Sequence, residues 1–175
     1  MGAWMNKFAQ MGHTRVIAGG HSNGGIWISD YLVLSGDKRI EGLVYFAPTV
    51  NVETWEERRS NKQQMQQMTE ACAAVKAGKG TEKVYGVQTA ILVCDSLNSQ
   101  AVSHPERLRH IKIPGFFIIG STDALFKRPG VRERLEKSYG GKLDTLVIEG
   151  GTHGLRESKD RLAIDVDGWI AKTFP

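Results

Sequence analysis

The chain has 175 residues, 41% of them apolar and 24% charged, which suits one soluble globular domain with a real core. Its net charge is +4, and Lys and Arg are scattered among acidic residues, which argues against a nucleic-acid-binding surface. The apolar runs are no longer than strands, so we expect no membrane span. No signal peptide is visible, and the localisation stays open.

The first third of the chain alternates between helix and strand. Apolar residues at helical spacing predict a short amphipathic helix over residues 3–11. A strand over 14–19 follows, then a glycine-rich turn and a helix that opens near Gly24. The apolar run over 40–47 predicts a second strand that is buried on both faces. Two strands joined by a helix form a right-handed, parallel βαβ unit.

Residues 51–110 have a different character. A long helix is predicted from Asn51 to about residue 77, with an apolar stripe on an otherwise polar surface. Residues 87–93 are compatible with strand or helix, 97–103 look irregular, and 105–110 form a short helical turn. We expect this insertion to be a helical lid or cap. The alternative is an ordinary surface helix whose stripe joins the core.

The last third returns to alternating elements. Strands are predicted over 113–120 and 143–149, each followed by a helix; the final helix covers about 158–173. The order predicts an α/β fold in a single domain, with a mostly parallel sheet of about four strands and flanking helices.

The histidines and cysteines give no sign of a metal or cofactor. The five histidines lack metal-ligand spacing, and the spacing of Cys72 and Cys94 matches no zinc or redox motif. Two cysteines are too few for a disulfide framework, so we expect both to behave as small buried hydrophobic residues.

One turn carries a recognisable motif. Residues Gly20-His21-Ser22-Asn23-Gly24 match G-x-S-x-G, the nucleophile elbow, between a predicted strand and a predicted helix. Gly20 and Gly24 are expected to remove side chains that would clash in so sharp a turn. Two alternatives stand beside this interpretation: a turn without chemistry, or a turn that binds phosphate where the helix opens at Gly24.

Two further polar residues follow predicted strands. Asp123 follows the strand at 113–120, and His153 follows the strand at 143–149. Functional groups gather at the carboxyl ends of parallel strands, and the order Ser, Asp, His is that of α/β-hydrolases. Together with the segments G-H-S-N-G-G, F-F-I-I-G-S-T-D and G-G-T-H-G, this order makes nearly the whole chain resemble the α/β-hydrolase superfamily.

The residue types define roles. Ser22 would be the nucleophile, His153 its general base, Asp123 the residue that orients the imidazole, and the backbone N–H of Asn23 an oxyanion donor. The rival acid is Asp95. Among the other histidines, His21 is expected to be a structural hydrogen-bonding residue beneath the elbow, and His104 and His110 to be surface residues.

The expected activity is that of a serine hydrolase that cleaves a carboxylic ester or related acyl compound through an acyl-enzyme. Thioester, lactone, lipid and peptide substrates stay open. The alternative is a non-catalytic or truncated α/β-hydrolase-like module with a binding or assembly role.

The resemblance also exposes a departure from the family. Members have further strands before the elbow strand, and those strands bring a second oxyanion donor; here the sequence begins at the preceding helix. We therefore expect an exposed strand edge at 14–19, which offers a route to a homo-oligomer. A fragment, a compact variant with the edge covered by another segment or subunit, and a misplaced start are the three explanations.

Overall fold

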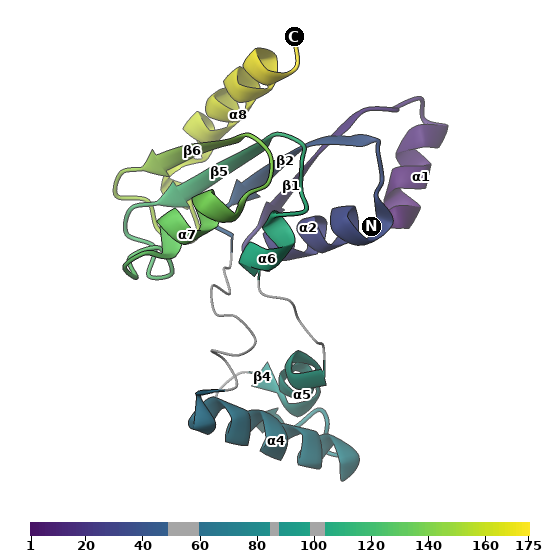
Figure 1. Ribbon diagram of the computed structural model, residues 1–175, viewed down its shortest axis with the longest axis vertical. Helices are drawn as coiled ribbons and strands as arrows, with labels where there is room; N and C mark the ends of the chain where they lie inside the picture. The colour runs from purple at the N-terminus through teal and green to yellow at the C-terminus, as the bar shows by residue number, and fades with distance from the viewer. Residues whose placement is uncertain (49–59, 85–87, 99–103) are drawn as a thin grey trace. The chain divides into compact units, whose positions relative to one another are not determined.

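The computed structural model describes residues 1–48, 60–84, 88–98 and 104–175 (Figure 1). The chain divides into two compact units. The first unites Met1–Val52 with His104–Pro175, and the second comprises Glu53–Ser103. The second unit is therefore inserted into the first along the sequence.

A four-stranded parallel sheet forms the centre of the first unit. Its order is β1-β2-β5-β6, with the strands at Val16–His21, Ile40–Phe46, Gly115–Gly120 and Leu143–Ile148. Every neighbouring pair is parallel. The helices of this unit are α1 (Gly2–Gln10), α2 (Asn23–Ser35), α6 (His104–Leu108), α7 (Val131–Ser138) and α8 (Lys159–Thr173). The predicted α/β class and parallel sheet are confirmed.

Helices cover both faces of the sheet. Successive side chains of a strand point to opposite faces, so each strand contributes residues to both cores. On one face, Leu43, Tyr45 and Phe117 pack in a core with residues of α1, α2, α6 and α7. On the other face, Val44 and Phe116 lie in a second core with Trp169 of α8. This double burial explains why the strands read as continuous apolar runs.

Strand β1 is an edge of this sheet, with β2 as its neighbour among the described residues. A groove of about 650 Å³ runs beside it, lined by residues of α1, β1 and α2 that include Phe8, Val16 and Ala18. Trp4 and Trp27 also line the groove, and each is 68% exposed. The described part of the chain thus contains the exposed edge that the sequence predicted.

The second unit is built around two helices. They are α4 (Lys62–Lys76) and α5 (Ala90–Asn98), with the short antiparallel strands β3 (Lys83–Val84) and β4 (Gln88–Thr89) between them. Met68, Ala71, Ala90 and Val93 form their shared core. The hairpin was not predicted, and α5 resolves the ambiguous segment after residue 87 as mostly helix. The predicted helix start at Asn51 lies outside the described residues, and the lid role stays a prediction.

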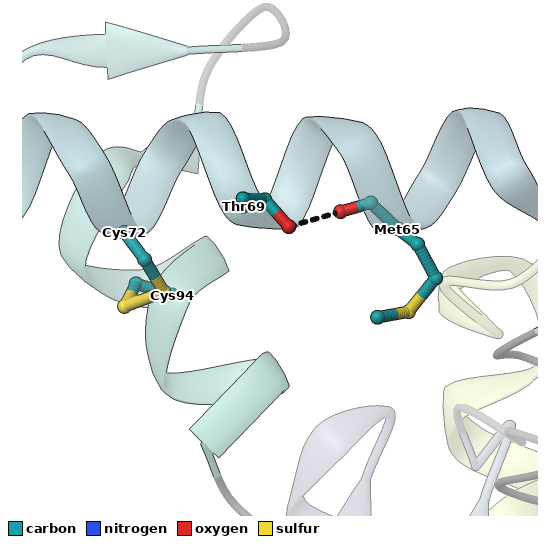
Figure 2. Close-up of a disulfide and its surroundings, with 4 residues drawn as sticks. All are labelled: Met65, Thr69, Cys72 and Cys94. Carbon is teal, nitrogen blue, oxygen red and sulfur yellow. Dashed lines mark hydrogen bonds between the residues drawn. A yellow bond between two sulfur atoms is a disulfide. The ribbon is translucent and has the colours of Figure 1, made fainter.

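A disulfide bond joins these two helices, which corrects the expectation that both cysteines are free. Cys72 on α4 and Cys94 on α5 have their Cα atoms 4.7 Å apart, and Figure 2 shows the bond. The prediction failed because Cys72 falls on the apolar stripe of α4, where a cysteine and a small hydrophobic residue look alike in sequence.

Reduction of this disulfide is expected to loosen the second unit. The bond closes a loop with a sequence separation of 22, which corresponds to about 3 kcal/mol of stabilisation. A reductant should therefore lower the thermal unfolding midpoint or speed proteolysis between residues 60 and 98. The double variant Cys72→Ser, Cys94→Ser is the control, because its unfolding should not respond to reductant. Equal responses of the two proteins would contradict the prediction.

Candidate active site

Ser22 occupies a strained turn between β1 and α2. β1 ends at His21 and α2 begins at Asn23, so that Ser22 alone makes the turn. Its φ of 54° and ψ of −124° lie outside the regions that non-glycine residues usually adopt. Its N–H donates to the carbonyl of Phe46 on β2 (3.0 Å). A strained serine on a strand–turn–helix junction is the geometry of a nucleophile elbow.

The glycines around Ser22 differ in their importance. A Cβ on Gly20 would lie 2.4 Å from the backbone carbon of Gly24, so no other residue fits without a backbone shift. A Cβ on Gly24 would meet nothing within 4 Å, which contradicts the prediction that this glycine also prevents a clash. The second glycine at which space is limited is Gly25, because an added Cβ there would lie 3.1 Å from side-chain atoms of Pro48 and Tyr45.

Two buried hydroxyl groups, on Ser29 of α2 and Tyr45 of β2, connect the helix to the sheet. Ser29 donates to the carbonyl of Gly25 (2.8 Å), and its oxygen lies 2.9 Å from the hydroxyl of Tyr45. Complete burial raises the pKa of Tyr45 well above its usual value, so this hydroxyl keeps its proton.

Asp123 lies in the loop after β5 and is 2% exposed. One carboxylate oxygen, Oδ1, accepts the N–H of Leu125 (2.9 Å), so Asp123 stabilises its own turn. The other, Oδ2, lies 2.8 Å from Nδ1 of His153. The same side chain therefore both stabilises its own turn and faces the histidine, and the second of these is the role that the sequence predicted.

His153 bridges Asp123 and Ser22. Its Nε2 lies 3.0 Å from Oγ of Ser22, while its Nδ1 faces Asp123. A carboxylate can only accept, so Nδ1 carries the proton and Nε2 is left to accept from the serine hydroxyl. The structure thus brings together Ser22, Asp123 and His153 from the ends of β1, β5 and β6, in a hydrogen-bonded chain that can move a proton from the serine.

Close contact between two loops holds the acid near the histidine. A Cβ on Gly120 would lie 2.2 Å from the carbonyl oxygen of Gly151. That carbonyl accepts from both the backbone N–H (3.0 Å) and the hydroxyl (2.7 Å) of Thr122. Neither Gly120 nor Thr122 was predicted to be a site residue. A glycine ending a buried strand was the available signal, since it often marks a close backbone approach.

The other predicted residues take varied positions. Asn23 is the first residue of α2, whose leading N–H groups have no carbonyl within the helix. His21 is exposed instead of lying beneath the elbow, and its Nε2 contacts the carbonyl of His153 (2.9 Å). His110 is exposed, as predicted, whereas the rival acid Asp95 falls on α5 in the second unit. The side chain of His104 lies outside what is described.

Within the described ranges, no cluster of three or more His, Cys, Asp or Glu side chains could hold a metal ion. None of the described helices has the length and apolar character that crossing a bilayer requires.

Comparison of the sequence with family models and curated proteins finds no match, whereas comparison of the structure finds many similar solved structures. No sequence model of a protein family matches, and no curated protein is similar in sequence. Est1E from Butyrivibrio proteoclasticus, with ferulic acid bound, aligns over 91% of this chain and 60% of its own length, at 14% identity and a TM-score of 0.66. An esterase from Rhodococcus aligns over 95% of this chain and 69% of its own, at 22% identity and a TM-score of 0.57. An esterase from Exiguobacterium antarcticum aligns over 94% of this chain and 70% of its own length, at 14% identity and a TM-score of 0.60.

The alignment with these neighbours agrees with the class that the structure shows, an α/β protein with a parallel sheet. The chain has the α/β-hydrolase fold, as its motifs predicted. It spans about 60 to 70% of the length of these neighbours.

Proposed function

We propose that this protein is a serine hydrolase that cleaves a carboxylic ester or a related acyl compound through an acyl-enzyme. The observation that carries the proposal is the continuous contact from Ser22 Oγ to His153 Nε2 (3.0 Å) and from His153 Nδ1 to Asp123 Oδ2 (2.8 Å). The strained backbone of Ser22 supports it, as do the esterase names of the structural neighbours from Rhodococcus and Exiguobacterium antarcticum.

The first half-reaction transfers the acyl group to the protein. Ser22 Oγ attacks the carbonyl carbon while Nε2 of His153 takes the hydroxyl proton. The negative charge moves to the carbonyl oxygen, where the N–H of Asn23 donates a hydrogen bond at the positive end of α2. The intermediate then expels the alcohol, which leaves with the proton from His153.

Water completes the cycle. His153 removes a proton from water, the hydroxide oxygen attacks the acyl carbon, and collapse releases the carboxylic acid and restores the Ser22 hydroxyl. Asp123 stays ionised throughout and stabilises the positively charged imidazolium. Because Asp123 is buried, its negative charge faces little competing water, which strengthens its attraction for the imidazolium.

A fluorophosphonate probe tests this proposal directly. The folded protein should be labelled at Ser22, located by mass spectrometry, and should hydrolyse a short-chain chromogenic ester. Folded protein that is neither labelled nor active would favour the alternative, a non-catalytic module of the same fold.

We also infer that two copies of the chain pair through the edge of β1. The edge strand offers backbone hydrogen-bonding groups, and the groove beside it carries two exposed tryptophans, a residue type common at interfaces. Pairing would cover both features at once.

The oligomeric state tests this inference. Light scattering at tens of micromolar protein is expected to give a dimer, and Trp27→Glu is expected to give a monomer. The control is Ile164→Glu on α8, because Ile164 is 72% exposed but lies away from the groove. A wild-type monomer at every concentration would overturn the inference.

A further inference from the structure

His21 connects the strand that carries the nucleophile to the loop that carries the base. It is the last residue of β1, directly before Ser22. Its Nε2 lies 2.9 Å from the backbone carbonyl oxygen of His153, and the two imidazole rings have centroids 5.3 Å apart at an angle of 50°. The residue beside the proposed nucleophile therefore touches the backbone of the proposed base.

The sheet order explains why such a connection matters. β1 and β6 are the two edge strands, separated by β2 and β5, so that no ladder of backbone hydrogen bonds joins them. Three strand spacings amount to about 14 Å. The loop after β6 must cross this distance before Nε2 of His153 can reach Ser22. Asp123, on the neighbouring β5 loop, holds the near side of the imidazole, whereas His21 holds the backbone from the side of β1.

The chemistry of the contact fixes its direction. A carbonyl oxygen can only accept, so Nε2 of His21 carries a proton and donates a hydrogen bond to the backbone carbonyl of His153. The bond acts on the main chain of residue 153, where a small displacement would swing the whole imidazole. Catalytic rates are sensitive to such displacements, because proton transfer needs a short distance between the heavy atoms.

We infer that His21 is a positioning residue, which holds the backbone of His153 so that its imidazole stays within reach of Ser22. The kinetic part of this inference rests on the proposed hydrolase function. The structural part, a restrained histidine loop, does not.

Two substitutions separate the donor from the ring. His21→Gln keeps an N–H donor at nearly the same reach, and His21→Phe keeps a planar ring without a donor. For ester hydrolysis, His21→Phe is expected to lower kcat about 3- to 10-fold with KM unchanged, as loss of one exposed hydrogen bond implies. His21→Gln should stay within about twofold of wild type.

Trypsin supplies a readout that needs no activity. Arg156 is exposed and begins the short 3₁₀ helix η1 (Arg156–Ser158) that directly follows the loop of His153, so cleavage after Arg156 reports how well this loop and its junction are held. His21→Phe should speed this cleavage at least about threefold, since the loop loses one restraining hydrogen bond. His21→Gln should not, and cleavage after the exposed Arg134 on α7 should be the same in all three proteins.

The outcomes are distinct. If wild-type protein neither hydrolyses esters nor reacts with the probe, the proposed function fails, and the trypsin comparison alone judges His21. If His21→Phe matches wild type in the cleavage after Arg156, the inference is overturned. It is equally overturned if His21→Gln and His21→Phe are impaired alike, because the ring and not the donor would then matter.

Discussion

Replacing Ser22 with alanine is expected to lower the rate of ester hydrolysis at least about 10⁴-fold, a typical result when a serine nucleophile is removed. The substitution deletes the oxygen that would form the acyl-enzyme and leaves Nε2 of His153 without its proton donor. Binding should change little, because the hydroxyl contributes reactivity more than contact area. The measurement is turnover of a short-chain chromogenic ester, together with fluorophosphonate labelling.

The matched control for this variant is Ser35→Ala. Ser35 is an exposed serine at the far end of α2, where its hydroxyl oxygen accepts the N–H of Asp37. Removal of the Ser35 hydroxyl should leave the turnover of the ester unchanged. Equal turnover by Ser22→Ala and wild type would eliminate Ser22 as the nucleophile and, with it, the proposed mechanism.

Replacing Gly20 with alanine is expected to destabilise the fold by about 3 kcal/mol or more. The added methyl carbon would lie 2.4 to 2.6 Å from backbone atoms of Gly24 and Gly25, and backbone cannot rotate away as a side chain can. Either β1 separates from α2, or the elbow opens and Ser22 leaves its position. Soluble yield and the midpoint of chemical unfolding are the measurements.

Gly24→Ala isolates the cause, because it adds the same methyl group to the same turn. A Cβ there meets nothing within 4 Å, and alanine favours helix over glycine by up to about 1 kcal/mol. This variant should therefore fold at least as well as wild type. If both alanine variants were equally destabilised, close packing at Gly20 would not be the explanation.

Much of the first unit could be predicted because its signals are local. Continuous apolar runs marked the buried strands, and the carboxyl ends of parallel strands share one edge of the sheet. Ser22, Asp123 and His153 could therefore be expected near one another from positions that are 131 residues apart at most. The glycine that ends β5 signalled a close backbone approach, but its partner Gly151 could not be predicted, since the contact depends on how two strand ends approach in space.

The second unit was predicted less well, for an equally physical reason. Its strands are two residues long, too short for any alternation of side chains to show. The pairing of Cys72 with Cys94 requires two helices to cross at the right height, and helical periodicity carries no information about a partner helix. His21 makes a structural hydrogen bond, as expected, but from an exposed position and to the loop of His153, because the path of that loop depends on tertiary contacts that the turn motif does not encode.

The division of the chain has a consequence for how such a protein can diversify. The first unit contains Ser22, Asp123 and His153. The second unit, residues 53–103, is inserted in the sequence between β2 and α6. Mutation, lengthening or exchange of the second unit changes none of these three residues and none of the strands that precede them. The three side chains and the second unit are thus encoded in separate stretches of the gene, and natural variation or laboratory recombination can change the second unit without changing the three side chains.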